Sequence, residues 1–134
     1  MEYVHGDLFE SKDSLVHCVS KDLAMGRGIA VGFKQRFGYG DLKKQNLNVG
    51  DVGVLLDGNR SIFYLITKEK YYEKPKYAAL QQCLVKLKQL CVSKNINVIS
   101  MPKIGCGLDK LEWSKVEKII IKCLDSIKVN VYVI

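Results

Sequence analysis

Amphipathic helices alternate with short β-rich runs along this chain, and this alternation limits the possible folds. Residues 77–92 carry apolar side chains at intervals of three and four, the spacing of one helix face. Residues 112–127 repeat this spacing, and Ser114 and Glu117 have the spacing of a capping box near its start. The positions predicted to face inward are Tyr77, Leu80, Leu84, Leu87 and Cys91 in the first helix, and Trp113, Val116, Ile120, Cys123 and Ile127 in the second.

The N-terminal half also alternates between the two kinds of element. A glycine and an asparagine in Asp57–Asn59 predict the turn of a β-hairpin, because both residues tolerate positive φ. Strands that alternate with helices after an opening β segment predict an α/β fold with three layers and a mixed sheet, in one domain over residues 1–134. The predicted strands are 3–5, 14–19, 53–56, 61–67, 97–101 and 128–134, and a further helix is predicted over 29–37.

Composition fits a soluble globular protein. The chain of 134 residues can bury roughly two-thirds of its unfolded surface, so it needs no metal or disulfide to fold. No apolar run approaches the ~20 residues of a membrane span, and the start of the chain does not resemble a signal peptide. Five cysteines without CxxC spacing and only two histidines argue against a disulfide framework and a structural zinc site. We expect an intracellular monomer, cytoplasmic or nuclear, with no membrane partner.

The net charge of +7 follows from 21 basic and 14 acidic residues. A basic surface attracts polyanions, which include nucleic acids and nucleotide phosphates. A solvated, lysine-rich surface explains the same charge equally well, so the charge alone does not identify a ligand.

Two glycine-bearing loops follow predicted strands and precede helices. They are Met25–Ile29 and Ile104–Asp109, and neither matches a dinucleotide fingerprint or the phosphate loop of nucleotide hydrolases. Glycines allow close approach of an oxyanion, and N–H groups at helix starts attract phosphates, so two such loops could hold a diphosphate. Asp7 ends the first strand and is either a hydrogen-bond acceptor for an adenine or the cap of a turn.

Lys68 ends the apolar strand 63–68, where a lysine is either a nucleophile or a solvated strand terminator. Asp109 closes the second glycine loop, as a general base, an orienting group or a helix cap. Ser20 ends the second strand and either binds a ligand or caps a turn. Cys106 lies between glycines, but no histidine is in a position to activate its thiol, which argues against a cysteine nucleophile.

Taken together, these segments resemble the macrodomain family, and within it the terminal ADP-ribose protein glycohydrolase branch, also called the O-acetyl-ADP-ribose deacetylase type. The resemblance runs nearly from end to end, and its last two segments, with Lys68 and Asp109, are specific to this branch. The segments that carry it are 3–9 (YVHGDLF), 17–20 (HCVS), 25–31 (MGRGIAV), 64–68 (YLITK) and 100–109 (SMPKIGCGLD).

The resemblance implies a six-stranded mixed sheet between helices that binds ADP-ribose in a crevice over the strand ends. It implies that Lys68 attacks the anomeric carbon of the distal ribose and forms a covalent lysyl–ADP-ribose, which Asp109 helps to form and resolve. It places Asp7 and Leu8 at the adenine and Ser20 near the distal ribose. The residues implied around the diphosphate and that ribose are Gly26, Arg27, Gly28 and Ile29, and Gly105, Cys106, Gly107 and Leu108.

We therefore expect a hydrolase that removes ADP-ribose, or an O-acyl group, at the distal ribose, without a metal or a cofactor. Its substrates would be ADP-ribosylated protein (esters of Glu or Asp), O-acetyl-ADP-ribose or ADP-ribosylated DNA. One alternative is a non-catalytic ADP-ribose reader, which would have no use for Lys68 and Asp109. Another is a DNA-directed de-ADP-ribosylase of the antitoxin type, which the positive charge favours.

Three segments depart from the pattern of the branch. Arg27 stands where a small residue is expected, residues 38–48 are shortened, and residues 68–77, with Tyr71 and Tyr72, differ in detail. Loops at these places would contact whatever carries the ADP-ribose, so they bear on substrate identity.

Overall fold

Six strands form one mixed sheet in the computed structural model, which describes residues 1–134. Neighbouring strands are parallel from β1 through β6, β5 and β2 to β4, and β3 pairs with β4 in the antiparallel direction at one edge. The strands are β1 (Glu2–His5), β2 (Ser14–Ser20), β3 (Val52–Asp57), β4 (Arg60–Lys68), β5 (Val98–Met101) and β6 (Lys128–Val133).

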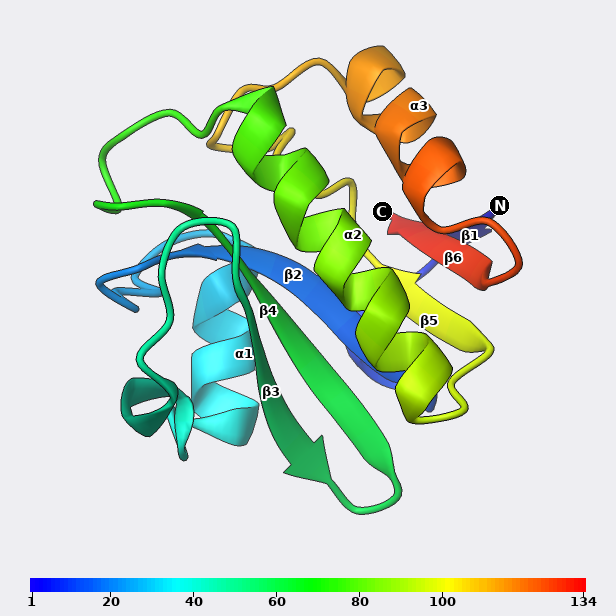
Figure 1. Cartoon of the computed structure of the whole chain (residues 1–134), viewed down its shortest axis with the longest axis horizontal. Coiled ribbons are helices and arrows are strands. Elements are labelled where there is room, and N and C mark those ends of the chain that lie inside the picture. Colours follow the sequence, from blue (N-terminus) through cyan, green and yellow to red (C-terminus); the bar gives the residue numbers. More distant parts are fainter.

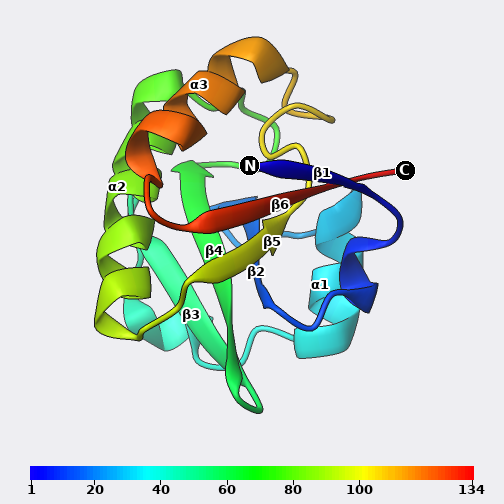
Figure 2. The same cartoon turned by 90° about the vertical axis from the view of Figure 1, so that its right-hand side faces the viewer.

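Helices cover both faces of the sheet, as Figures 1 and 2 show. The helices are α1 (Ile29–Phe37), α2 (Tyr77–Ser93) and α3 (Trp113–Cys123), with two short 3₁₀ helices, η1 (Leu8–Glu10) and η2 (Leu42–Gln45). Helices α2 and α3 pack on one face over a core that includes Val16 and Phe63, and α1 packs on the other over Leu15 and Ile62. Successive residues of β2 and β4 therefore point into different cores, which explains why both strands are buried at nearly every position.

The predicted architecture of three layers around a mixed sheet is confirmed. The helix over 29–37 has the predicted bounds, and the hairpin forms between β3 and β4 with Gly58 at φ 61° in its turn. Most strands differ from the prediction by one residue at an end. The two 3₁₀ helices were not predicted, because segments of three or four residues carry no periodicity.

The prediction for the last helix is wrong at both ends. The helix starts at Trp113 with Glu112 as its N-cap, so the capping box of Ser114 and Glu117 does not form at its start. It ends at Cys123 instead of residue 127, because Ser126 adopts a left-handed φ of 69° and Ile127 donates to the Leu124 carbonyl in a turn. The chain thereby enters β6 while Ile127 still packs against the core.

The parallel strands bring the candidate residues to one edge of the sheet. Parallel strands have their carboxyl ends on the same side, and in open α/β sheets ligands bind there. Asp7, Ser20 and Lys68 lie at or just after the ends of β1, β2 and β4, and residues 102–109 follow β5. In Figure 1 the segments after β2 and β4 lie at the upper left, far from the β3–β4 turn at the bottom. None of the helices is long and apolar enough to cross a membrane.

Candidate active site

An ion pair between Lys68 and Asp109 stands at this edge. The Lys68 Nζ lies 2.5 Å from Asp109 Oδ1, and the two side chains are only 10% and 19% exposed. Lys68 Nζ also donates to the backbone carbonyl of Tyr71 at 2.9 Å. A lysine side chain has four flexible bonds, and these two acceptors hold its amine at one place. The lysine is therefore not the solvated strand terminator that its sequence position allowed.

A register shift between β2 and β4 sets the position of this lysine. The pairing runs from Leu15 opposite Ile62 to Val19 opposite Ile66, and then Ser20 pairs with Lys68 because Thr67 is skipped. Beyond the shift, the Lys21 N–H donates to the Lys68 carbonyl at 2.8 Å. Such irregularities re-aim a side chain at the end of a strand. Here the irregularity lies where the amine of Lys68 meets the loop after β5.

Asp109 reaches Lys68 from the second glycine loop. Gly105 in this loop has φ 72°, and a β-carbon there would lie 2.8 Å from Leu111 Cδ1, so both the backbone conformation and the close packing favour glycine. Lys110 follows with a left-handed φ of 61°. Asp109 does not cap a helix, since the N-cap of α3 is Glu112. The role of helix cap that the sequence left open is thereby excluded.

The two glycine loops touch one another. Gly28 is the N-cap of α1 with φ 62°, and a β-carbon at this position would lie 3.4 Å from Leu108 Cδ1. Leu23 and Met25, both buried, hold left-handed conformations in the same loop, with φ of 55° and 44°. Non-glycine residues in this region are strained, and such strain gathers at ligand sites. Gly26, Gly28 and Gly107 are exposed members of these two loops, and α1 begins directly after Gly28.

Asp7 caps η1, since its Oδ1 accepts a hydrogen bond from the Phe9 N–H at 2.9 Å. Its other carboxylate oxygen makes no hydrogen bond within the chain and remains an acceptor for a ligand. Leu8 is only 3% exposed and its side chain belongs to the core under α1, so any contact of this residue with a ligand would come from its backbone.

Ser20 and Cys106 have partners within the chain. Ser20 Oγ donates to the carboxylate of Asp22, which is the turn interaction that the sequence allowed. Cys106 Sγ donates to the Ile104 carbonyl, and burial raises the pKa of this thiol. His17 cannot activate the thiol, because its ring stacks on that of Phe33 in the core on the α1 side, with the ring centroids 3.7 Å apart. The thiol therefore lacks the features of a nucleophile.

Asp22 is a site residue that the sequence did not reveal. Its carboxylate accepts from Ser20 Oγ, from the Ala24 N–H at 3.2 Å and from the Tyr71 N–H at 3.1 Å. Burial opposes the charged form, but these hydrogen bonds outweigh it and lower the pKa of Asp22. An aspartate two residues after a strand is a common turn residue. No sequence motif around Asp22 predicts its hydrogen bond with Tyr71, which lies 49 residues further along the chain.

A pocket of about 330 Å³ lies beside this loop, lined by Asp22 and Leu23 and by residues of η2 and its C-terminal connection, among them Lys43 and Asn46. Lys68, Asp109 and the glycine loops do not line it. We place the candidate site at the ion pair and the glycine loops, because the reactive groups and the strained backbone gather there.

Known proteins share this fold and much of this sequence. The family model described as Macro domain matches residues 16–120. The chain is 45% identical over 135 residues to "ADP-ribose glycohydrolase OARD1" of Homo sapiens, across 97% of this chain and 89% of that protein. It is 30% identical over 127 residues to "DNA ADP-ribosyl glycohydrolase" of Mycobacterium tuberculosis, across 87% and 36%. Its structure matches "Macrodomain of Mycobacterium tuberculosis DarG" with a TM-score of 0.86 at 27% identity, covering 98% and 95%.

Proposed function

The chain belongs to the macrodomain family, and from that premise we propose that it is a hydrolase that releases ADP-ribose, or an acyl group, at the distal ribose of an ADP-ribosylated substrate. Two similar proteins are named as glycohydrolases of ADP-ribose or of ADP-ribosylated DNA, which supports this class of reaction. The observation that carries the proposal is the shielded ion pair of Lys68 and Asp109 beside the two glycine loops.

In the proposed reaction Lys68 is the nucleophile. An amine attacks only after it has lost a proton, and Asp109 Oδ1, at 2.5 Å, is placed to receive it. The nitrogen then forms a bond to the anomeric carbon of the distal ribose, while the bond from that carbon to the carboxylate of an ester breaks and the carboxylate leaves. Water then attacks the anomeric carbon of the resulting lysyl–ADP-ribose, the carbon–nitrogen bond breaks, and one proton of the water passes to solvent. The proton held by Asp109 returns to the amine, and free ADP-ribose departs.

Other residues of the edge would bind the ligand. The free oxygen of Asp7 would accept a hydrogen bond from the adenine amino group. The N–H groups at the start of α1 and the exposed glycines of both loops would surround the diphosphate, which favours such positions. Binding and chemistry therefore depend on different residues, and this separates the proposed hydrolase from a reader.

The test is a turnover assay on a panel of ADP-ribosylated substrates, with intact-mass spectrometry of the protein. We expect Lys68→Ala to abolish turnover while calorimetry still detects ADP-ribose binding. Asp109→Ala should slow resolution, so that one ADP-ribose accumulates on the chain by mass. Lys118→Ala removes an exposed lysine of α3, outside the ion pair and the glycine loops, and is the matched control, with wild-type turnover expected. Turnover in Lys68→Ala would refute the nucleophile, and binding without turnover in the wild type would identify a reader.

A DNA-linked ADP-ribose is the second candidate substrate. Tyr71 and Tyr72 are 60% and 73% exposed in the segment that follows Lys68, with their rings 5.4 Å apart, and Lys70 and Lys74 flank them. Exposed aromatic rings among cations are typical of single-stranded nucleic-acid binding. With a DNA substrate we expect KM to rise steeply with salt, because each phosphate contact releases counterions. A KM that is insensitive to salt, or no turnover on DNA, would leave protein esters or O-acetyl-ADP-ribose.

A further inference from the structure

Asp22 connects the loop after β2 to the loop after β4. One of its oxygens, Oδ1, accepts from Ser20 Oγ and from the Ala24 N–H, which fixes the carboxylate within its own loop. The other oxygen, Oδ2, accepts from the Tyr71 N–H at 3.1 Å. The only hydrogen bond of this carboxylate outside its own loop therefore comes from Tyr71.

The backbone of Tyr71 links Asp22 to Lys68 through two hydrogen bonds. Its N–H donates to Asp22, and its carbonyl accepts from Lys68 Nζ at 2.9 Å. The segment is also tied to the loop after β2 by backbone bonds, from the Lys21 N–H to the Lys68 carbonyl and from the Asp22 N–H to the Glu69 carbonyl. Those bonds hold residues 68 and 69. Asp22 is the group from outside the segment that holds residue 71, whose carbonyl contacts the amine.

We infer that Asp22 is a positioning residue for Lys68. It holds the Tyr71 carbonyl against Lys68 Nζ, and this carbonyl and Asp109 together define where the amine stands. This inference rests on the proposed function, in which the amine is the nucleophile. Asp22 touches neither Lys68 nor Asp109, and it acts through the backbone of Tyr71.

The physical reason lies in the directions of the three amine hydrogens. When one proton passes to Asp109, the neutral amine can rotate about its last carbon–nitrogen bond, which carries its lone pair away from any fixed target. A hydrogen bond to the Tyr71 carbonyl restricts this rotation, because one N–H stays on the carbonyl. Without Asp22, residues 70–72 lose their anchor to the loop after β2, and the carbonyl no longer restrains the amine.

The experiment compares Asp22→Ala and Asp22→Asn with Asp51→Ala in the full chain. Asp51 is the matched control, because its carboxylate also fixes a backbone N–H, that of Asn48 at 2.8 Å, and pairs with Lys86 away from the ion pair. We expect kcat to fall at least tenfold in Asp22→Ala while ADP-ribose affinity changes less than threefold. Asp22→Asn keeps one carbonyl oxygen and the shape of the side chain, so it should retain part of the rate. Asp51→Ala should lower the melting temperature without lowering kcat.

A second measurement does not depend on turnover. Limited acetylation followed by peptide mass spectrometry measures the reactivity of Lys68, with the exposed Lys118 of α3 as the internal reference. We expect Lys68 to be labelled several times faster in Asp22→Ala than in the wild type, and at the wild-type rate in Asp51→Ala. If Asp22→Ala does not fold, Asp22→Asn serves for both readouts.

The inference is overturned if Asp22 variants keep the wild-type kcat and the wild-type labelling of Lys68. It is also overturned if the whole loss lies in ADP-ribose affinity, since Asp22 would then only support the first glycine loop. Wild-type protein without turnover would instead refute the proposed function, and the labelling of Lys68 would still decide whether Asp22 positions the amine.

Discussion

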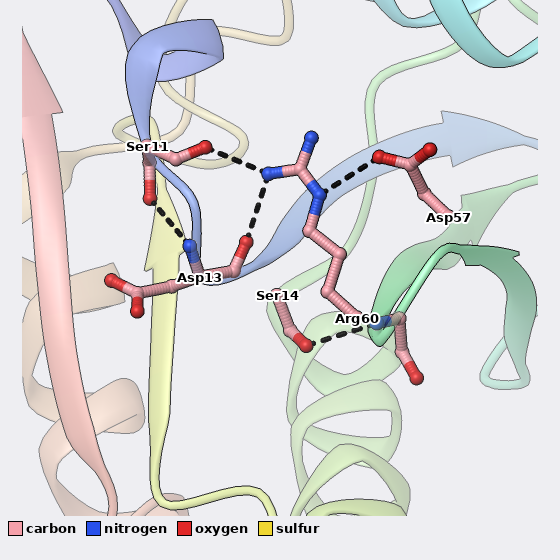
Figure 3. A network of polar contacts seen from close by, with 6 residues as sticks. Ser11, Asp13, Ser14, Asp57 and Arg60 are labelled. Atoms are coloured by element: carbon pink, nitrogen blue, oxygen red, sulfur yellow. Dashed lines mark hydrogen bonds and ion pairs between the residues drawn. The ribbon is translucent and has the colours of Figure 1, made fainter.

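Strand β4 carries a cation at each end, and the two ends are built in different ways. At its start, Arg60 donates to the carboxylate of Asp57 and to the carbonyls of Ser11 and Asp13, as Figure 3 shows. At its end, Lys68 donates to Asp109 and to the Tyr71 carbonyl. Both side chains connect segments that are distant in the sequence. The two cations differ in whether they can lose a proton, and this difference decides whether each end can take part in a reaction.

The start of β4 is held by a network of hydrogen bonds around Arg60. A guanidinium cannot lose its proton in a protein, and its rigid donors bond several acceptors at once: Nη1 donates to both carbonyls and Nε to Asp57. Ser14 accepts from the Ser61 N–H at 3.0 Å in the same network, and the hydroxyl of Ser11 lies 2.8 Å from that of Ser100. The groups at this end are joined by hydrogen bonds and the cation cannot give up its proton, so this end holds the hairpin to the segment before β2.

The end of β4 is different in its partners and in its backbone. An amine can give its proton to a carboxylate 2.5 Å away, and Leu23, Met25 and Lys110 nearby keep strained left-handed conformations. Strained backbone conformations persist only where the surrounding structure enforces them, and they gather at functional sites. The comparison teaches that a partly buried cation at a strand end serves stability when it cannot lose its proton and can serve chemistry when it can.

The largest effect is expected from Lys68→Arg. The guanidinium keeps the positive charge and the partner Asp109 but stays protonated, so it cannot attack. We expect turnover to fall by at least about 10³-fold, with the melting temperature near that of the wild type. Turnover assays and calorimetric scans measure the two quantities. Activity retained in Lys68→Arg would mean that a positive charge, and not a nucleophile, is what the site needs.

Arg60→Ala should show the opposite behaviour. Its removal leaves the carbonyls of Ser11 and Asp13 without their charged donor, and we expect a loss of about 2–4 kcal/mol in the free energy of unfolding. The kcat of the folded protein should stay unchanged. Arg60→Lys should destabilise the protein less than Arg60→Ala does. An ammonium keeps the charge but does not reproduce the planar guanidinium, whose Nη1 donates to both carbonyls while its Nε donates to Asp57. Urea denaturation gives the free energy, and a lowered kcat at full folding would contradict the division of roles.

His17 of β2 pairs with Tyr64 in the middle of β4. Its titration makes the stability of the protein depend on pH. Burial lowers the pKa of His17 to about 3, and neither ring nitrogen has a hydrogen bond. The unfolded chain binds a proton there below about pH 6.5 and the folded chain does not, so stability falls with pH from about 6.5 downwards. We expect a loss of about 2 kcal/mol between pH 6.5 and 5.

His17→Leu should remove this loss in the same range, although it starts from a different stability. The lowered pKa values of Asp22 and Asp51 affect stability only below their ordinary value of 3.8, so they do not overlap with this range. Denaturation at pH 7 and at pH 5 measures the slope. An equal slope in His17→Leu and the wild type would refute the assignment to His17.

The smallest effect is expected at the other end of the ligand. Asp7→Ala should weaken ADP-ribose binding about tenfold, because the adenine loses one hydrogen bond, while kcat stays near wild type. Calorimetry and turnover assays measure both. An unchanged affinity would restrict Asp7 to capping η1, which would confine ligand recognition to the glycine loops.

The sequence by itself determined which segments form helices and strands and which residues are candidates for the active site. Periodicity predicted α1 and α2, turn residues predicted the β3–β4 hairpin, and the resemblance identified Lys68 and Asp109 as the candidate reactive pair. It missed the end of α3, because residues 124–127 continue the apolar spacing although Ser126 breaks the helix with a left-handed φ. Periodicity records which side chains are buried, and a turn can bury Ile127 as well as a helix can.

Only the tertiary structure decided which residues meet. Strand β2 lies between β4 and β5, and this order brings Lys68 to Asp109, 41 residues further along the chain. The register shift opposite Thr67 and the contact of Asp22 with Tyr71 arise from the same arrangement. The order of parallel strands depends on how whole helices pack across the sheet, and no local stretch of residues encodes it. The partners of Lys68 therefore follow from the assembled sheet, whereas the lysine itself could be picked out from the sequence.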